Sequence, residues 1–286
     1  MKKFIFSLVL LSTTVIASAT DVWEGEHAVK WENTLIIEAT KFADMKVGDK
    51  LVIDFKDAIG EVIELHSNGA MLPGTRYAHH IYNDQSNAEV FATPAMTASL
   101  KEHGLEICGS GFTATKVWYG DGKEGIDDMT VWSGFFWMDK WSTLEITKNC
   151  FAGVDWDKIS AIRFYSEANR TDYVINVMTK WGNDGKLGDQ TTMTMTDEYA
   201  ELSLEGIDME AALADVDRLM IQCNKESGAP FNFTQVELVA KSSAVRNVSA
   251  KTDRADNSIY TISGVKVNNI GQKGLYIVNG RKFAGK

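Results

Sequence analysis

Tryptophan is the residue type in this chain whose chemistry stands out. The 286 residues include 8 Trp, 8 Tyr and 13 Phe. Sugar rings have apolar faces and a hydroxyl rim, so proteins hold them by stacking an exposed Trp or Tyr on a face and bonding the rim with amide, carboxylate or guanidinium groups. Any Trp that the fold itself does not need is therefore a candidate for binding a glycan.

The sequence repeats itself, and the repeat separates two kinds of Trp. Ten of the 34 positions from Val22 to Phe55 are identical to the residue 109 places further on, including Trp23 with Trp132. This predicts two copies of one domain. The expected organisation is a signal peptide at 1–19, a first domain at 20–120, a linker at 121–128, a second domain at 129–240, a linker at 241–258 and a tail at 259–286.

A residue that the fold needs should occur in both copies, whereas one that a ligand needs can occur in one. On this logic Trp23 and Trp132 belong to the core, and Trp31, Trp137 and Trp141 are predicted to stack on ligand. The alternative is that these three pack between the two domains. Trp181 precedes the turn 182–185, which either presents it to a ligand or is anchored by it.

Polar and aromatic residues also gather at 76–85. Arg76 and Tyr77 are predicted to line a sugar site of the first domain, and the alternative is a plain strand beside a hairpin. The pair His79 and His80 is not expected to bind a metal, because adjacent strand residues point to opposite faces.

Alternation of apolar and polar residues predicts the elements that hold these side chains. Stretches such as 51–55, 112–117, 159–165 and 173–177 have period two, are rich in β-branched and aromatic residues and are separated by Gly, Asn and Asp. The pattern predicts antiparallel strands. We expect an all-β chain of two tandem jelly-roll-like sandwiches, short helices at 96–103 and 209–216, and a small β tail.

The motif search favours binding over catalysis. No serine-hydrolase elbow, zinc-protease helix or phosphate loop occurs in the sequence. A glycoside hydrolase with carboxylates distant in sequence stays a less favoured alternative. Cys108, Cys150 and Cys223 are expected to be buried free thiols, with one disulfide as the alternative. No cofactor is predicted. The loop 120–128 has enough carboxylates for Ca²⁺ but lacks the EF-hand order, so a solvated linker is favoured.

Charge and the first residues indicate export. The formal charge of −10 argues against nucleic acid and anionic membranes as partners. A basic start, an apolar stretch from Phe4 to Ile16 and the A-x-A site Ala17–Ala19 predict a signal peptide. The apolar stretch is shorter than the roughly 20 residues that a membrane span needs. We expect an extracellular or cell-surface location, with the periplasm as the alternative.

The tail and the repeat both resemble known families. The tail has Ile259-Tyr-x-x-x-Gly264 followed by 273–282 (Lys-Gly-Leu-Tyr-Ile-Val-Asn-Gly-Arg-Lys). It resembles the C-terminal sorting domain of exported Bacteroidetes proteins, which implies export by a type IX secretion system. The Trp-x-Gly near the start and the segments 42–49 and 100–117 resemble β-sandwich modules of secreted Bacteroidetes glycanases and esterases, which implies carbohydrate binding. In the second copy the Val-Gly-Asp of 47–49 becomes Trp-Asp-Lys at 156–158.

Together these features predict an exported, monomeric, non-catalytic protein that binds a polysaccharide or another glycan. A structural or adhesive surface protein that binds another protein is the alternative, because the same aromatic residues would suit a protein interface.

Overall fold

The computed structural model describes residues 19–59, 62–77, 79–81, 85–167, 173–188, 191–193, 199–223 and 231–241, and the four tail strands within 259–285. It divides into two compact units, Met1–Lys241 and Ser242–Lys286. The predicted signal peptide and the linker 241–258 lie, except for Ala19 and Lys241, outside the described residues. In the described part of the chain, no helix has the length and apolar character to cross a membrane.

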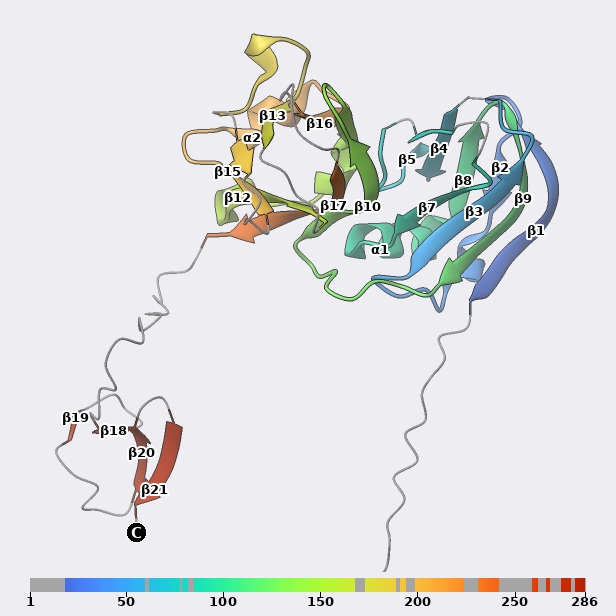
Figure 1. The fold of residues 1–286 in the computed structure, drawn as a ribbon. Helices are drawn as coiled ribbons and strands as arrows, with labels where there is room; N and C mark the ends of the chain where they lie inside the picture. Colours follow the sequence, from blue (N-terminus) through green and yellow to red (C-terminus); the bar gives the residue numbers. More distant parts are fainter. Residues whose placement is uncertain are drawn as a thin grey trace, which may run out of the picture. The chain divides into compact units, whose positions relative to one another are not determined.

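The first half of the larger unit consists of two antiparallel sheets (Figure 1), which we call the first sandwich. One sheet has the order β1 (Thr20–Val29), β9 (Phe112–Gly120), β3 (Lys50–Lys56), β7 (Asn87–Phe91). The other has the order β2 (Leu35–Ile37), β8 (Leu105–Gly109), β4 (Val62–Ser67), β5 (Ala70–Met71), and β6 (His79–His80) also pairs with β4. The first strand lies beside the last and the second beside the last but one, which is the connectivity of a jelly roll.

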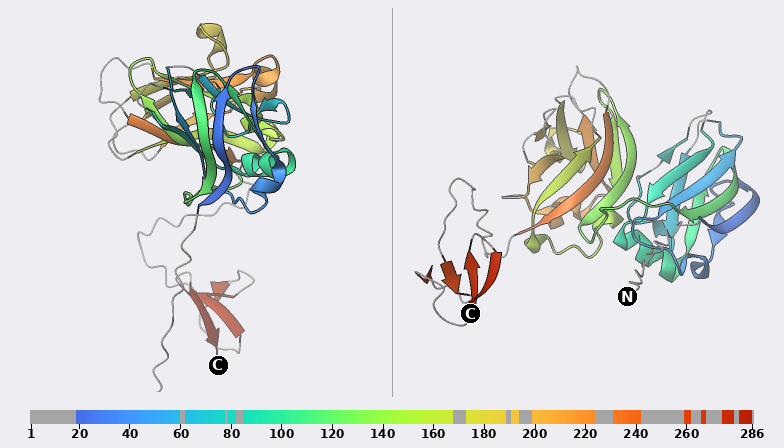
Figure 2. Two further views of the ribbon diagram at one scale, coloured as in Figure 1. Left: turned by 90° about the vertical axis from the view of Figure 1, so that its right-hand side faces the viewer. Right: turned by 60° about the horizontal axis from the view of Figure 1, so that its bottom comes forward.

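The second half, the second sandwich, repeats this strand order. Its sheets are β10 (Thr130–Met138), β17 (Phe231–Ala240), β12 (Ile159–Ser166), β15 (Tyr199–Ser203), and β11 (Thr143–Thr147), β16 (Arg218–Cys223), β13 (Tyr173–Met178), β14 (Thr191–Met193). Figure 2 shows both sandwiches from two further directions. The all-β fold predicted from the alternation is therefore confirmed.

The helices are few and short, as predicted. In the described part of the chain the α-helices are α1 (Pro94–His103) and α2 (Met209–Ala214), and the 3₁₀ turns are η1 (Ala39–Phe42), η2 (Lys148–Phe151), η3 (Trp156–Lys158) and η4 (Asn183–Gly185). Thr93 caps the first α-helix by accepting from Met96 N, and Asp208 caps the second by accepting from Ala211 N.

The Trp-x-Gly motif has the same structural role in both sandwiches. A Cβ added to Gly25 would lie 3.0 Å from Cζ2 of Trp23, and one added to Gly134 would lie 3.1 Å from Cζ2 of Trp132. Both glycines lie where the strand shifts register against its partner. A Cβ at either position would crowd the indole, so glycine lets the Trp side chain pack closely on the bulged strand.

Each sandwich encloses its own hydrophobic core. The two Trp residues that the repeat aligns, Trp23 and Trp132, pack on these cores. Trp132 is 2% exposed and Trp23 is partly buried against the first core. The core role predicted for both is confirmed. None of the three cysteines forms a disulfide, as predicted. Cys150 and Cys223 are buried as expected, whereas Cys108 is only half-buried.

The smaller unit is described through its strands alone. β18 (Ile259–Thr261), β19 (Lys266–Val267), β20 (Gly274–Val278) and β21 (Arg281–Gly285) form an antiparallel sheet in the order β19-β18-β20-β21. Small strands in the tail were expected from its sequence, and the structure contains them.

Burial of the Trp132 indole generates a stability prediction. Replacing a buried Trp by Ala removes its apolar contacts and leaves a cavity, so we expect Trp132→Ala to lower the free energy of unfolding by about 3–5 kcal/mol. Urea denaturation followed by circular dichroism measures this. Trp181→Ala is the matched control, because that side chain is 62% exposed and its loss should change stability by about 0.5 kcal/mol or less. Equal midpoints for the two variants would contradict the core role.

Candidate functional site

The two sandwiches are joined by backbone hydrogen bonds at one sheet edge. β11 is an edge strand of the second sandwich. A segment of the first sandwich lies along it: Tyr77 N donates to Glu145 O at 2.8 Å, and Thr147 N donates to Thr75 O at 3.3 Å. Arg76 and Ile146 form the bridge between these bonds. The segment 75–77 therefore acts as a short added strand that covers the edge of β11.

Side chains of η2 strengthen the same junction. Gly74 N donates to the buried Cys150 Sγ at 3.2 Å, and Asn149 Nδ2 donates to Met71 O at 2.7 Å. Burial raises the pKa of the Cys150 thiol, so this sulfur stays neutral and packs as a small apolar group. The backbone of the segment before Arg76 is thus held from the second sandwich as well as from its own.

The linker 121–128 takes part in the junction through Lys123. Its N donates to Gly48 O at 2.8 Å, and its Nζ donates to Gln235 Oε1 at 3.0 Å. The ammonium also lies 6.0 Å from the centroid of the Phe91 ring. Burial lowers the pKa of Lys123. The expectation of a solvated linker is therefore wrong at this residue, because its charged end is held between β7 and β17.

The Val-Gly-Asp turn of the first sandwich owes its glycine to this contact. Gly48 has a φ of +90°, and an added Cβ would lie 2.6 Å from the carbonyl oxygen of Lys123. A side chain there would collide with the linker as it leaves β9. The motif is explained by packing of the linker.

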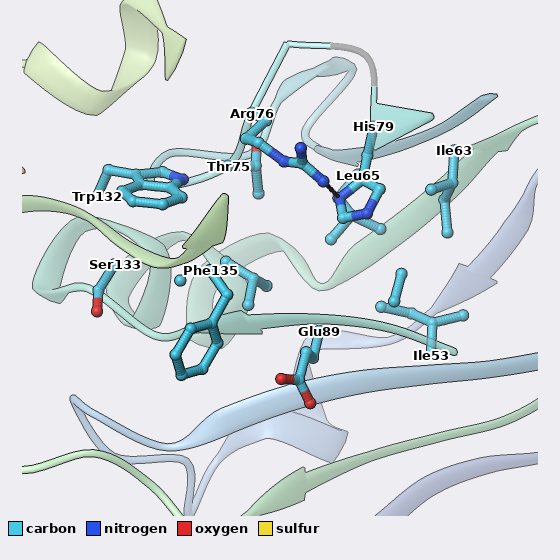
Figure 3. Close-up of a pocket in the computed structure, with 13 residues that line it drawn as sticks. Ile53, Ile63, Leu65, Thr75, Arg76, His79, Glu89, Trp132, Ser133 and Phe135 are labelled. Atoms are coloured by element: carbon cyan, nitrogen blue, oxygen red, sulfur yellow. Dashed lines mark hydrogen bonds between the residues drawn. The ribbon is translucent and has the colours of Figure 1, made fainter. Parts of the chain in front are cut away.

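Arg76 lies across a small cavity of about 30 Å³ at the junction. Figure 3 shows its guanidinium reaching His79, with Glu89 and Phe135 on the facing wall. Arg76 Nη2 donates to His79 Nδ1 at 2.6 Å, and the guanidinium lies 5.1 Å from the centroid of the Phe136 ring. Because Arg can only donate, His79 Nδ1 accepts, and the imidazole is the neutral tautomer with its proton on Nε2.

A larger groove of about 830 Å³ opens beside this cavity and takes its walls from both sandwiches. Its lining combines aromatic rings with amide, hydroxyl and carboxylate groups. From the first sandwich come Arg76, Tyr77, His79, His80, Gln85, Asn87, Ala88 and Glu89, and from the second come Phe135, Phe136, Trp137, Ser142, Thr143, Glu145 and Asn232.

Trp137 is the most exposed aromatic residue of the groove. It lies on the edge strand β10, is 60% exposed and sits directly across from Asn232 of β17. Cross-strand partners share a face of the sheet, so an indole plane and an amide lie side by side. Asn232 Nδ2 donates to Glu167 Oε2 at 3.0 Å, which fixes the orientation of this amide.

Tyr77 is held on the other wall by a charged stack. The Arg218 guanidinium lies 3.8 Å from the centroid of the Tyr77 ring and forms a 2.7 Å ion pair with Glu145. Burial and the nearby Asp217 raise the pKa of Tyr77, so its hydroxyl remains protonated and able to donate a hydrogen bond at neutral pH. Arg218 therefore fixes two lining residues at once.

The structure brings together three of the six predicted site residues. Arg76, Tyr77 and Trp137 line the groove. Trp141 lies on the turn between β10 and β11, is 52% exposed and has a φ of +64°. A φ in this region is rare for a bulky residue.

The other two predicted residues lie elsewhere. Trp31 is 54% exposed on the turn between β1 and β2, and Trp181 is 62% exposed on the turn after β13. Because Trp31, Trp137 and Trp141 are each more than half exposed, the alternative that they pack between the two domains is wrong.

Sequence reasoning missed half of the groove. Asn87, Glu89, Glu145 and Asn232 were not singled out, although each lines it. Their signal is the strand register: Asn232 is recognisable only once β17 is known to pair with β10. Among the residues with described positions, no group of three or more His, Cys, Asp or Glu side chains is arranged to hold a metal ion.

A second groove, of about 980 Å³, lies at the end of the second sandwich, between η3 and the segment 203–210. Its lining mixes apolar and acidic side chains, and its Trp156 packs on the ring of Phe151 with centroids 5.5 Å apart. It lacks an aromatic side chain as exposed as Trp137, so the junction groove is the stronger candidate for stacking.

Comparison with known proteins shows little. No family model matches the chain, and no curated protein matches it. One similar solved structure is the Bacteroides ovatus mixed-linkage glucan utilization locus protein SGBP-B in complex with a mixed-linkage heptasaccharide, with 18% identity and a TM-score of 0.31. The match covers 35% of this chain and 28% of that one.

Another similar structure is the major capsid protein P2 from bacteriophage PM2, with 10% identity and a TM-score of 0.26, covering 80% of this chain and 99% of that one. At these scores neither similarity assigns a function to this chain.

The neutral His79 generates a pH prediction. Burial, followed by the charges of Arg76 and His80, holds its pKa well below the ordinary value of 6.5. Below pH 6.5 the imidazole of His79 binds a proton in the unfolded chain but not in the folded chain. This difference should lower the free energy of unfolding by about 1.4 kcal/mol for each pH unit between 6.5 and the pKa of His79 in the folded chain.

Urea denaturation at pH 7.5 and 5.5 tests this against His79→Gln, whose amide oxygen still accepts from Arg76 but does not titrate. The variant should lose less stability on acidification than the parent chain. An identical loss in both would show that His79 does not carry this pH dependence.

Proposed function

We propose that this protein binds a glycan in the groove between its two sandwiches, and that it does so without catalysis. The observation that carries the proposal is Trp137, a 60% exposed indole on the wall of an 830 Å³ groove, with the Asn232 amide directly beside it. A flat apolar ring next to oriented hydrogen-bonding groups matches the two kinds of surface on a pyranose ring. The volume lies in the range of about 300–1,000 Å³ typical of small-molecule sites.

The charges of the groove favour a neutral glycan. Arg76 is bonded to His79, and Glu145 is paired with Arg218. Glu89 lies 3.5 Å from Lys50 Nζ. These pairs leave amides and hydroxyls as the main groups able to bond a ligand. The chain as a whole has a formal charge of −10, which repels polyanionic polysaccharides.

The carboxylates of the groove support binding over hydrolysis. Glycoside hydrolysis needs two carboxyl groups that act on the scissile bond. Glu89 is paired with Lys50, and Glu145 is paired with Arg218. Both carboxylates that line the groove are therefore engaged by a cation of the protein itself.

We further propose that the protein is an exported, two-copy jelly-roll protein with a signal peptide at 1–19 and a sorting tail at 259–286. The identical strand order of the two sandwiches supports the duplication. The resemblance of the tail to Bacteroidetes sorting domains supports secretion to the cell surface or beyond it. A glycan-binding protein would meet its polysaccharide there.

Removing the Trp137 indole tests the binding proposal. Affinity gels containing xyloglucan, arabinoxylan, galactomannan or mixed-linkage β-glucan identify the ligand, and calorimetry with its hexasaccharide gives the Kd. We expect Trp137→Ala to weaken binding in the junction groove at least tenfold, since the loss of a central aromatic anchor costs about 2 kcal/mol or more. Trp137→Phe should recover part of the affinity, because it keeps a flat ring.

Trp181→Ala is the control, because it also removes an exposed indole but lies outside the groove lining. Retention of the parent chain on none of the gels would overturn glycan binding and favour a protein partner. Release of reducing sugar would favour a hydrolase.

Deleting residues 258–286 tests the sorting tail. If the tail directs export, the truncated chain should accumulate in the periplasm of its own host, while the full chain reaches the cell surface or the medium. Cell fractionation with immunoblotting measures this. The deletion falls in the separate unit Ser242–Lys286, so glycan binding should stay unchanged. Normal surface delivery of the truncated chain would contradict the sorting role.

A further inference from the structure

A second exposed indole lies in a hollow of the first sandwich, away from the junction groove. Trp31 is 54% exposed and lines a hollow of about 390 Å³ with Ile59, which is 68% exposed. Hydrophilic and charged side chains surround these two. The polar lining residues with side chains are Lys30, Glu32, Asp57, Ser110 and Thr113.

Backbone hydrogen bonds hold both walls of the hollow in place. Lys30 N donates to Asn33 O at 3.3 Å, and Asn33 N donates to Lys30 O at 3.0 Å, which closes the turn that carries Trp31. On the opposite wall Ile59 N donates to Gly111 O at 3.0 Å. The indole is therefore presented by a closed turn next to an anchored segment.

The same turn of the second sandwich also carries an exposed Trp. Trp31 lies between β1 and β2, and Trp141 lies between β10 and β11, which are the corresponding strands. The two indoles are 54% and 52% exposed. Yet the repeat offset aligns Trp31 with Lys140 and Trp141 with Glu32.

Simple copying of one ancestral Trp at that offset does not account for this pair. Folding does not account for it either, since an indole more than half exposed buries little apolar area. A functional requirement for an exposed indole on each turn accounts for both Trp31 and Trp141.

The size and composition of the Trp31 hollow fit a sugar better than a protein. Its volume lies in the range of about 300–1,000 Å³ for small-ligand sites. A stable protein interface needs about 800 Å² of buried surface and 20–30 residues on each side. This hollow offers two large exposed apolar side chains, those of Trp31 and Ile59. Its charged residues include both signs, which suits a neutral ligand.

We propose that the Trp31 hollow is a second binding site for the neutral glycan of the junction groove, so that one chain binds a polysaccharide at two places. This inference rests on the proposed function. Both sites belong to the unit Met1–Lys241. Once one segment of a long polysaccharide is bound, the second site meets the same chain at an effective concentration on the order of millimolar, which raises the overall affinity about 10²–10⁴-fold.

The proposal is tested with the polysaccharide, which can reach both sites at once, and with its hexasaccharide, which reports on each site separately. Trp31→Ala should reduce retention on the affinity gel of the best polysaccharide at least tenfold. Calorimetry with its hexasaccharide should show two sites in the parent chain and one in this variant, and the Kd of the remaining site should stay within twofold of the junction groove's own value. Trp137→Ala should leave one hexasaccharide site, the Trp31 hollow. The double variant should bind neither the polysaccharide nor the hexasaccharide. Trp181→Ala again controls for loss of an exposed indole.

Several results would overturn the proposal. If Trp31→Ala leaves gel retention and the number of bound hexasaccharides per chain unchanged while Trp137→Ala lowers both, the hollow is not a glycan site. The proposed function then still stands. If the parent chain sediments as a dimer that Trp31→Ala dissociates, the hollow is a contact between copies of this chain. If the parent chain binds no glycan, the proposed function fails, and the second site fails with it.

Discussion

The groove depends on the pairing of a three-residue segment with an open sheet edge. Residues 75–77 of the first sandwich bond to β11 of the second through Tyr77 N and Thr147 N. An unpaired edge strand exposes donors and acceptors that need partners, and this segment supplies them. The same pairing brings Arg76 and Tyr77 to the side on which β10 presents Trp137. Without it each sandwich would carry only its own part of the groove lining.

Ionic contacts around that pairing fix the side chains it brings together. Arg76 is held between His79 and the Phe136 ring, and Arg218 between Tyr77 and Glu145. Each guanidinium is engaged by a hydrogen bond or ion pair on its edge and by a ring on its face, which is the geometry that suits Arg and not Lys. The positions of Arg76 and Tyr77 in the groove lining are thus fixed by contacts within the protein, an arrangement that would lower the ordering cost of the binding proposed above.

Local rules of β structure explain how the aromatic residues divide between core and surface. In β10 the bulge near Gly134 lets Trp132 turn into the core, while Phe135 and Trp137 remain exposed on either side of the half-buried Phe136. At the same bulge Gly134 leaves room for this indole, because an added Cβ would lie 3.1 Å from its Cζ2 atom. One short strand therefore supplies both an anchor for the core and the exposed indole on which the proposed glycan site depends.

Much of this protein follows from its sequence alone. Period-two alternation determined the strands, because it reflects which side of a sheet is buried. The 109-residue offset separated the core residues Trp23 and Trp132 from the exposed Trp31, Trp137 and Trp141, and half of the predicted site residues line one groove. The tertiary structure alone decided that 75–77 pairs with β11, that Asn232 faces Trp137, and that Lys123 is drawn out of its linker into the junction. It also showed that Trp31 and Trp141 occupy the same turn one residue apart, which an ungapped alignment conceals. These facts depend on register and on contacts between residues far apart in the chain, and a local pattern carries no information about either.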